Sequence, residues 1–481
     1  MAKVVFCQRV VYAFFGTMSI SAMLKKHGHE VELVMDADIE NNVREILKLK
    51  PDIVAFSTIT ASGEFEWALE TVSRLKAAGN RIISVLGNLH PTLFPEESIK
   101  EEAVDIICRG EGEYAMLELS NSIDANTSYT DIAGLWIKEQ GRIARNPLRP
   151  LIDLDELPFP DRELYQKYGY FNKPSSIDVL AGRGCVFDCS YCYNQLTRKL
   201  YNSNSKFARK HSVGRVVTEL TELKLKYNPK SFTFVDEYFT IDRKWIAEFS
   251  EKYSAHIGLP FVCNIQAASA DEDTIAALAK AGVSKVCFGL ESGNEKIRKE
   301  ILNKNIGNDQ IIACAKLLHK YGIKFLTANI LGLPGESVDN ALETVTLNRL
   351  IKTDYLYFSI FQPYPGLKIS KYCLEKGLLP NMENASYDST YFKNSPLVQK
   401  DIRRLVNLHK LFYLAVKTPV PLNFLKLIIK LPANFIFDLI FISSFGWMQL
   451  KCFCRSPRQL LRMGTGNLKV FYSPKQNGAS L

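Results

Sequence analysis

The sequence predicts an α/β fold in three parts: an N-terminal doubly wound, Rossmann-like sheet, a partial TIM-type (β/α) barrel and a C-terminal helical extension. Strand-like apolar runs alternate with helical patterns in residues 1–125 and again in residues 171–385. Residues 126–170 interrupt this alternation as a linker, and residues 386–481 carry helical patterns. The 481 residues, 47% of them hydrophobic, are enough to build more than one core.

The first part contains five expected strands separated by helices. The strands are Lys3–Cys7, Glu30–Val34, Ile53–Ser57, Ile82–Leu86 and Asp105–Cys108, and the helices are Ser19–His27, Asn42–Leu49 and Glu64–Ala78. Ligands of doubly wound sheets bind at the carboxyl ends of the strands, so the loops after these strands are the expected binding loops.

Small and hydroxyl-bearing residues fill those loops. They are Ser57, Thr58 and Thr60 after the third strand, Gly87, Asn88, His90, Pro91 and Thr92 after the fourth, and Gly110 and Glu111 after the fifth. Small side chains let a large flat ligand approach the backbone, although ordinary turns use the same residues. A lone histidine in such a loop is more often a capping or packing residue, so His90 is not expected to bind a metal.

The linker begins with a predicted hairpin, in which Leu135–Lys138 and Arg142–Ala144 flank Gly141. The next stretch, Leu154–Arg162, contains two prolines among acidic residues and predicts an irregular connector.

The most distinctive stretch of the chain runs from Gly184 to Tyr193 and places Cys185, Cys189 and Cys192 at i, i+4 and i+7. Three thiolates at this spacing suit a cubane iron–sulfur cluster with one iron left without a protein ligand. A closed zinc site needs a fourth ligand, and no nearby Cys or His supplies it. The alternative interpretation is three unrelated core thiols or half of a zinc site.

This stretch resembles the CxxxCxxC signature of radical S-adenosylmethionine (SAM) enzymes. The resemblance implies a [4Fe–4S] cluster on Cys185, Cys189 and Cys192, whose open iron chelates the amino and carboxylate groups of SAM. Electron transfer from the cluster then cleaves SAM to a 5′-deoxyadenosyl radical. An external electron donor such as flavodoxin or ferredoxin is therefore expected.

The barrel is expected from six further strands, with the site at their carboxyl ends. They are Ser176–Ala181, Ser231–Val235, Phe261–Asn264, Lys285–Gly289, Lys324–Leu331 and Tyr355–Gln362. The candidate SAM-binding residues lie in the cysteine loop or at these strand ends: Tyr191, Asp236, Glu237, Asn264, Gln266, Glu291, Ser292, Ile330 and Leu331.

Their chemistry suggests different parts of SAM. The carboxylates of Asp236 and Glu237 are expected at the ammonium, as in the second motif of the family. Glu291 and Ser292 are expected at the ribose. The apolar or aromatic side chains of Tyr191, Ile330 and Leu331 are expected at the adenine, and Asn264 and Gln266 are further candidates.

The run from Pro51 through Gly87–Thr92 to Arg109–Glu113 resembles the cobalamin-binding domain that precedes many radical SAM domains. The resemblance implies cobalamin binding by the loop residues named above, from Ser57 to Glu111. The Asp-x-His-x-x-Gly motif that supplies an axial histidine in other cobalamin proteins is absent, so cobalt without a protein histidine is expected.

The resemblance covers residues 1–385 and implies an enzyme that methylates an unactivated carbon or phosphorus of a small-molecule substrate. One alternative is a radical cyclase or oxidoreductase of the anaerobic magnesium-protoporphyrin monomethyl ester cyclase type. Another is a non-catalytic cobalamin sensor, against which the three intact cysteines argue.

The net charge of +9 is concentrated in residues 401–481, where twelve Lys or Arg and two acidic residues give +10 and leave the rest of the chain near neutral. A nucleic-acid enzyme would carry its basic surface across the main domains, so no nucleic-acid partner is expected. Helical patterns cover Arg403–Val416, Leu422–Ile429 and Phe435–Met448. The apolar run Phe435–Phe445 is expected to be too short to span a bilayer. The interpretations left are a helical cap packed on the barrel and a helix lying on a membrane surface.

Eleven cysteines in so long a chain do not form a disulfide scaffold. No apolar signal peptide is expected, because the first residues predict a strand. A cytoplasmic enzyme is therefore expected, peripheral at the inner membrane face if the C-terminal region contacts lipid.

Overall fold

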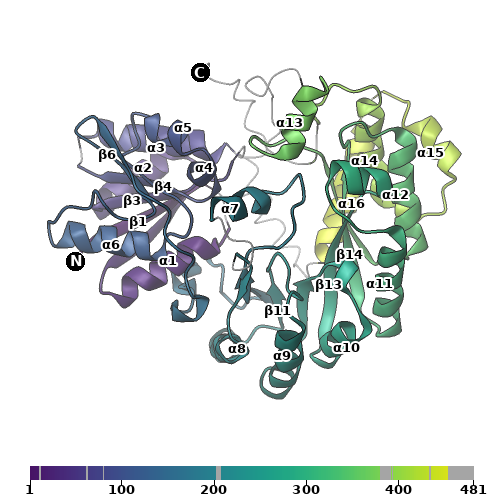
Figure 1. The fold of residues 1–481 in the computed structure, drawn as a ribbon, viewed down its shortest axis with the longest axis horizontal. Helices are drawn as coiled ribbons and strands as arrows, with labels where there is room; N and C mark the ends of the chain where they lie inside the picture. Colours follow the sequence, from purple (N-terminus) through teal and green to yellow (C-terminus); the bar gives the residue numbers. More distant parts are fainter. Residues whose placement is uncertain are drawn as a thin grey trace. The chain divides into compact units, whose positions relative to one another are not determined.

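A computed structural model describes residues 1–9, 12–60, 63–79, 81–201, 207–379, 392, 394–432 and 435–452 (Figure 1). Its internal contacts divide the chain into two compact units. The first comprises Met1–Asn172 and Leu196–Phe207, and the second comprises Lys173–Gln195 and the described residues after Phe207. Each unit is built on a sheet of its own.

A seven-stranded sheet in the order β2-β1-β3-β4-β5-β6-β7 forms the centre of the first unit. Its strands are β1 (Lys3–Gln8), β2 (Glu30–Met35), β3 (Ile53–Ser57), β4 (Ile83–Gly87), β5 (Ile106–Cys108), β6 (Leu135–Glu139) and β7 (Arg142–Arg145). The first five strands are parallel and the last two antiparallel. The predicted doubly wound sheet is confirmed, and the hairpin expected in the linker extends this sheet.

Helices cover both faces of the sheet because its strands are apolar on both sides. On one face α1 (Phe15–Lys26) packs against α6 (Glu113–Asp124), and on the other α2 (Ile39–Leu49) packs against α3 (Glu64–Ala77) (Figure 1). Two short helices, α4 (Leu89–Leu93) and α5 (Pro95–Lys100), connect β4 to β5.

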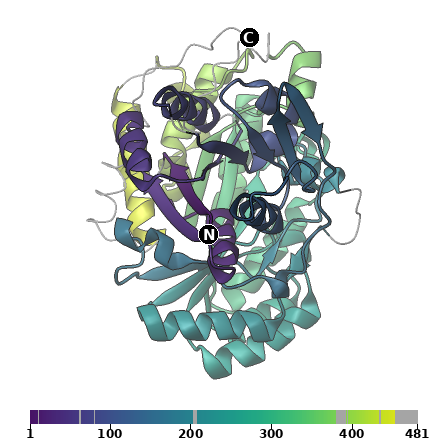
Figure 2. The same cartoon turned by 90° about the vertical axis from the view of Figure 1, so that its left-hand side faces the viewer.

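The second unit contains six parallel strands in the order β15-β14-β13-β12-β11-β8, the half-barrel that the sequence predicted (Figure 2). The strands are β8 (Ser176–Val179), β11 (Ser231–Phe234), β12 (Phe261–Asn264), β13 (Val283–Glu291), β14 (Lys324–Leu331) and β15 (Tyr355–Ile360). A separate antiparallel pair joins β9 (Gly182–Arg183) to β10 (Arg209–Lys210). Neighbouring strands of the half-barrel follow one another along the chain, except that β9 and β10 come between β8 and β11.

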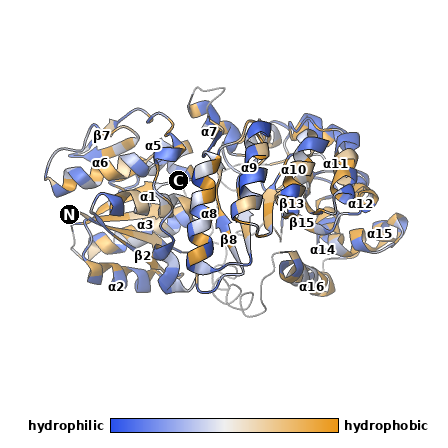
Figure 3. Cartoon of the chain, turned by 90° about the horizontal axis from the view of Figure 1, so that it is seen from below, coloured by the Kyte–Doolittle hydropathy of each residue, from blue (hydrophilic) through white to orange (hydrophobic). Residues whose placement is uncertain are grey.

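The helices between the strands carry both hydrophobic and hydrophilic residues, as amphipathic layers do (Figure 3). Those between the half-barrel strands are α8 (Val213–Tyr227), α9 (Arg243–His256), α10 (Glu272–Lys280), α11 (Asn308–Lys320) and α12 (Val338–Leu350), and α13 (Lys368–Glu375) follows β15. Helix α7 (Asn194–Leu200) lies between β9 and β10, and most of it belongs to the first unit. Alternate strand residues such as Phe232 and Phe234 are buried. The Phe234 ring lies 4.6 Å from that of Phe239 and 5.5 Å from that of Phe249, centroid to centroid.

Three helices form the described C-terminal part: α14 (Ile402–Lys417), α15 (Leu422–Ile428) and α16 (Phe435–Cys452). Helix α14 packs against α12 and β15 through buried residues that include Leu405, Leu408 and Phe412. It is therefore a helical cap on the half-barrel. Helix α16 continues past its predicted end and has 18 residues. By length and composition α16 could cross a membrane, and no other helix in the described residues meets that test. This corrects the expectation that the segment is too short.

Candidate active site

The cysteine loop is anchored to a segment more than a hundred residues later in the chain. The backbone N–H of Ser190 donates to the Leu302 carbonyl at 2.9 Å, and its Oγ donates to the Ile301 carbonyl at 2.6 Å. Beside it, Asn303 Nδ2 donates to the Asp188 carbonyl at 2.7 Å. The half-barrel therefore determines where the middle of the loop lies.

The loop is also braced from within. Gln195 is fully buried, and its Nε2 donates to the carbonyls of Cys189 and Ser190, both at 3.0 Å. Gly184 precedes the first cysteine with a φ of +86°, in the left-handed region that favours glycine. The glycine thus turns the chain from β9 into the cysteine loop.

The three thiols lie close enough to influence one another's ionisation. Cys185 is buried, and Cys189 and Cys192 are half-buried. Burial raises the pKa of Cys189 to about 11, and the nearby ammonium of Lys304 opposes this rise. Burial also raises the pKa of Cys192, to which the Glu237 carboxylate adds a smaller effect.

This donor set fits a cluster better than a single ion. In the described part of the chain, no three His, Cys, Asp or Glu side chains converge closely enough to hold one metal ion. A cubane offers a separate iron atom to each of three thiolates, so it suits an all-sulfur set of three. Cys185, Cys189 and Cys192 form such a set on one anchored loop.

A tyrosine, a carboxylate and an ammonium meet next to this loop. Tyr191 Oη donates to Glu291 Oε1 at 3.0 Å, and Lys304 Nζ donates to the same oxygen at 3.0 Å. Lys304 also donates to the Gly289 carbonyl at 2.6 Å. Glu291 and Lys304 are buried, and both lie within electrostatic reach of Cys189. We call Tyr191, Glu291 and Lys304 the charged triad.

Glu291, the last residue of β13, has a φ of +62°. This left-handed conformation is uncommon for a residue other than glycine, and it coincides with a shift in the register of β13 against β14. The side chain of Glu291 is therefore held in place by an irregular strand end, as is frequent at functional sites.

The carboxylates expected at the SAM ammonium differ in their surroundings. Asp236 is buried: its Oδ2 accepts from the Ala181 N–H at 2.9 Å, and its Oδ1 pairs with Lys210 Nζ at 2.9 Å. Glu237 is exposed, and its carboxylate accepts from the backbone N–H of Gly184. Glu237 is thus directed at the cysteine loop, whereas Asp236 has partners that hold the neighbouring backbone.

The Lys210 ammonium also lies 4.4 Å from the ring centroid of Phe239 and 4.6 Å from that of Trp245. Asn264 Nδ2 donates to the Asp236 carbonyl at 2.8 Å at the end of β12. Gln266 is half-buried nearby in sequence, and its carbonyl accepts from Ser269 Oγ at 3.1 Å. Asn264 therefore holds the end of β11 in addition to its expected role.

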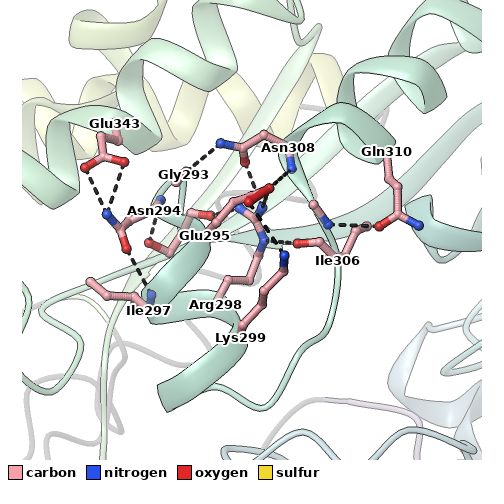
Figure 4. Close-up of polar contacts among 12 residues, drawn as sticks. Gly293, Asn294, Glu295, Ile297, Arg298, Lys299, Ile306, Asn308, Gln310 and Glu343 are labelled. Atoms are coloured by element: carbon pink, nitrogen blue, oxygen red, sulfur yellow. Dashed lines mark hydrogen bonds and ion pairs between the residues drawn. The ribbon is translucent and has the colours of Figure 1, made fainter.

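A dense network lies just after β13 (Figure 4). Arg298 is fully buried, and its guanidinium donates to the carbonyls of Ser292 and of Ile306 and to Asn308 Oδ1, the last at 2.7 Å. Asn308 Nδ2 donates to the Gly293 carbonyl at 3.2 Å. Ser292 is also fully buried, and its Oγ accepts from the Asn294 N–H at 3.3 Å. This network fixes the strand end at which Glu291 and Ser292 were predicted to bind ribose.

The two apolar residues expected at adenine face opposite ways. Ile330 is half-buried, but Leu331 is fully buried in the core that β14 forms with α12 and α14. The Leu331 side chain therefore points into this core and the Ile330 side chain to the other face, because successive strand residues point to opposite faces. After the strand, Glu336 Oε2 accepts from the N–H of Gly332 at 2.7 Å, and burial raises the pKa of Glu336 to about 8.

In the first unit, most of the predicted cobalamin residues share one hydrogen-bonded edge. Thr58 Oγ1 donates to the Gly87 carbonyl at 3.2 Å, and Asn88 Nδ2 donates to Ser57 Oγ at 2.9 Å. Thr92 Oγ1 donates to the Asn88 carbonyl at 2.6 Å and accepts from the Gly110 N–H at 3.0 Å. The carboxyl ends of β3, β4 and β5 are linked in this way.

The remaining predicted residues lie along the same edge. The Glu111 carboxylate accepts from the Ile152 N–H at 3.0 Å, and Pro91 is buried in α4. The Thr60 hydroxyl is buried without a hydrogen-bond partner among the described residues. Gly110 has a φ of +76°, which strains any other residue, and a Cβ there would lie 2.1 Å from the Tyr201 hydroxyl oxygen, so the tyrosine would have to move.

A small cavity lies at the point where the strand order changes direction, between β1 and β3. Doubly wound sheets bind their ligands at this point. The cavity is lined by Cys7, Gln8, Arg9, Phe56, Ser57, Thr58, Glu64, Trp67 and Ala68.

His90 is a packed residue. Its ring centroid lies 4.0 Å from that of Phe65 and 5.6 Å from that of Phe94, and Glu97 is 3.7 Å from its Nε2. Burial lowers the pKa of His90 to about 4. The ring therefore belongs to the interior of the unit.

Three basic residues near the site, Lys304, Arg298 and Lys210, were not predicted from the sequence. Each is a basic residue in a stretch with no motif, and each acquires its partner through the fold. A search for basic residues between the end of β13 and the start of α11 would have found the first two.

The family model described as the radical SAM superfamily matches residues 179–347, and that described as the B12 binding domain matches residues 4–120. An uncharacterized methyltransferase of Pyrococcus horikoshii is 30% identical over 382 residues, which cover 77% of this chain and 81% of the relative. An anaerobic magnesium-protoporphyrin IX monomethyl ester cyclase of Rubrivivax gelatinosus is 30% identical over 72% of this chain and 63% of its own. A cytidylyl-2-hydroxyethylphosphonate methyltransferase of Streptomyces wedmorensis is 23% identical over 78% and 80% of the two chains.

Two solved structures share the fold. The cobalamin-dependent SAM radical enzyme OxsB with aqua-cobalamin bound aligns with a TM-score of 0.68 at 15% identity, over 100% of this chain and 77% of its own. The radical SAM methyltransferase TsrM from Kitasatospora setae, with cobalamin and a [4Fe–4S] cluster bound, aligns with a TM-score of 0.64 at 16% identity, over 78% and 75%.

Proposed function

Because the chain belongs to the radical SAM superfamily, in the group that carries a B12-binding domain, we propose that it methylates an unactivated carbon or phosphorus of a small-molecule substrate. It is a radical SAM enzyme, and the cofactors of its group are a [4Fe–4S] cluster, SAM and cobalamin. One observation carries the proposal: three thiols on an anchored loop lie next to a buried charged triad at the end of β13.

Different residues of the second unit would bind the iron–sulfur cluster and SAM. Cys185, Cys189 and Cys192 would hold the cluster, which when bound supplies the electron for reductive cleavage of SAM. SAM carries an ammonium and a carboxylate, and the site offers groups of both signs. Lys304 would pair with the carboxylate, and Glu237 would accept from the ammonium.

The Tyr191 ring and Ile330 would contact the adenine, while Glu291 and Ser292 would bind the ribose. The bond from Tyr191 to Glu291 would orient the ring and the carboxylate together. Asn264, Gln266 and Asp236 complete the proposed SAM site, Asp236 through its hold on the backbone near the cysteine loop.

The edge residues of the first unit, from Ser57 to Glu111, would bind cobalamin. The small cavity between β1 and β3 supports this, because it lies among the same strand ends. We propose that no histidine of this edge is an axial ligand of cobalt, because His90 packs against the rings of Phe65 and Phe94.

Anaerobic reconstitution with iron, sulfide, cobalamin and methyl-labelled SAM tests the function. On addition of a reductant, the reconstituted enzyme should form 5′-deoxyadenosine. When a small-molecule extract is also added, mass analysis should find a labelled, methylated product. A Cys189→Ala protein should yield neither, while Cys314→Ala, at a buried thiol of α11, should yield both. Absence of 5′-deoxyadenosine from the intact protein would instead favour the non-catalytic cobalamin sensor.

A radical cyclase is the second candidate, favoured by the relative of that activity at 30% identity. The same labelled SAM separates the two reactions. A cyclase would form 5′-deoxyadenosine in step with an oxidised product that carries no label. A methylase would place the label in the product.

The chemistry also determines the partners. A one-electron donor such as flavodoxin or ferredoxin would serve the cluster, and substitution of either for a chemical reductant tests that role. We place the enzyme in the cytoplasm, in peripheral contact with the inner membrane face through its C-terminal region.

A further inference from the structure

Helix α16 is apolar on two sides, and the half-barrel covers one of them. Phe437, Met448 and Cys452 are buried where α16 packs against α14 and β15. On the opposite side Phe435 is 76% exposed, Leu439 58% and Ile442 61%. We call Phe435, Ile436, Leu439, Ile442 and Trp447, all at least half exposed, the outer face of α16. Their helical spacing places these five residues on one side of the helix, with Ser443 and Gly446 between Ile442 and Trp447.

Further apolar side chains are exposed on the preceding helix, α15, and just after it. Phe424 and Leu427 of α15 and Leu431 just after it are also more than half exposed. Isolated exposed apolar residues are normal, but a contiguous patch usually marks an interaction site.

The outer face fits contact with a membrane surface rather than passage through the membrane. The length of α16 would permit a crossing, but its inner side belongs to the core of the second unit. A crossing would strip Phe437 and Phe441 from α14 and the Phe358 ring. A helix with one side in the protein and the other apolar side free can lie in the lipid headgroup region.

The charges around the face favour acidic lipid. Lys430 lies just before the helix and Lys451 near its end, and both are exposed. The Lys451 ammonium is 5.0 Å from the centroid of Trp447, an arrangement suited to the boundary between headgroups and chains. The one acidic residue of the helix, Asp438, pairs with Lys410 at 2.6 Å. Three further basic residues, Arg455, Arg458 and Arg462, lie outside the described residues.

The same charges disfavour a second copy of the chain as the occupant. A two-fold contact pairs the same patch on both copies. With antiparallel α16 helices, it would place Lys430 of each copy near Lys451 of the other. An acidic lipid surface is complementary to both lysines at once.

We propose that the outer face of α16 rests on an acidic lipid surface and holds the enzyme there reversibly. This deepens the peripheral location proposed above, and it rests on the proposed function for its purpose, which is access to an apolar, membrane-dissolved substrate.

Vesicle flotation of the full chain tests the proposal. The protein should float with vesicles of equal phosphatidylglycerol and phosphatidylcholine at low salt, and it should be released by high salt. Replacement of Leu439 and Ile442 by Ser should abolish flotation. The matched control replaces the exposed Leu225 and Leu374, which lie on α8 and α13, by Ser and should float normally.

The charge test uses Lys430→Glu with Lys451→Glu, which should weaken partition by at least about thirtyfold, because each lysine near an acidic surface contributes about 1 kcal/mol and each new carboxylate is repelled. Its matched control is Lys244→Glu with Lys280→Glu, two exposed lysines of α9 and α10. Equal binding to pure phosphatidylcholine, binding insensitive to the α16 substitutions, or a dimer that these substitutions dissolve would each overturn the proposal. Formation of 5′-deoxyadenosine is measured in every variant, so failure of the lipid contact is distinguished from failure of the enzyme.

Discussion

Lys304 Nζ and Glu291 Oε1 form a buried ion pair at 3.0 Å, and the same oxygen accepts the Tyr191 hydroxyl. The pair therefore joins the cysteine loop, the end of β13 and the turn before α11. A lone buried charge is costly, so each partner depends on the other.

Lys304→Met should remove this ion pair and with it the connection between the three segments. It leaves Glu291 without its ammonium, which should lower the free energy of unfolding by about 3 kcal/mol, and it should weaken SAM binding by removing the proposed carboxylate partner. Denaturant unfolding and equilibrium dialysis with SAM measure the two effects. Lys304→Arg should restore more of the stability than of the SAM binding. The exposed pair of Lys320 with Glu272 supplies the control, Lys320→Met, which should change neither.

Gly293→Ala should destabilise the network after β13. A Cβ at this position would lie 2.3 Å from the carbonyl carbon of Glu343 in α12 and 2.4 Å from the Thr344 nitrogen. Backbone cannot yield as a flexible side chain does, so a loss of about 1–3 kcal/mol is expected from thermal or denaturant unfolding. Gly214→Ala in α8, where no atom lies within 4 Å of the added Cβ, should be neutral or stabilising. Equal effects of the two substitutions would contradict this packing.

Replacement of Cys185, Cys189 or Cys192 by Ala should abolish the cluster. The intact reconstituted protein is expected to hold about four irons per chain on three thiolates, with the broad absorbance of a [4Fe–4S] centre. Iron analysis and absorbance measure the loss directly. A full cluster in any of the three variants would refute the ligand assignment, and Cys314→Ala should retain its iron.

His90→Ala should leave the absorbance spectrum of bound cobalamin unchanged. The ring packs on Phe65 and Phe94 and is not expected to reach cobalt. Loss of this packing should lower stability, so spectra are compared at a temperature where both proteins are folded. A shift of the cobalamin bands would show that an axial ligand had been removed.

His90 also predicts a pH dependence of the first unit. Burial lowers its pKa from an ordinary 6.5 to about 4, in spite of Glu97 at 3.7 Å. Between these values the unfolded chain binds more protons, so stability should fall as the pH falls, by about 3 kcal/mol in total. Hydrogen exchange of the β3 and β4 amides measures it. His90→Phe should reduce the slope, while the exposed His27→Gln should not.

Most of the strands were predictable because apolar periodicity reports burial. Predicted and observed bounds of β3, β12 and β14 coincide, and most other strands shift by a residue or two. The segment after β13 was the least predictable part of the fold. The pattern ended at Gly289, but the strand continues to Glu291, where Lys304 and a shifted register hold an unusual backbone. Such a partner cannot be read from local sequence.

The direction of side chains on a strand was the second feature that the sequence could not predict. Ile330 and Leu331 are adjacent and equally apolar, yet Leu331 belongs to the core with α12 and α14. Which residue faces the ligand depends on which side of the strand the helices cover. By contrast, the three cysteines stood out in the sequence, because few other functions require three thiols at that spacing, whereas the loops after β3, β4 and β5 were singled out by their family resemblance, since ordinary turns use the same residues.

The anchoring of the cysteine loop has a consequence for biogenesis. The carbonyl of Ile301 that binds Ser190 is 111 residues further along the chain. A ribosome adds about 5–20 residues per second, so the loop waits roughly 5–20 s for its anchor after it is made. During that interval the nascent thiols lack the support that spaces them. Iron–sulfur delivery before this point would meet an unformed acceptor, so insertion of a cluster into this loop belongs after residues 301–303 have been made and folded.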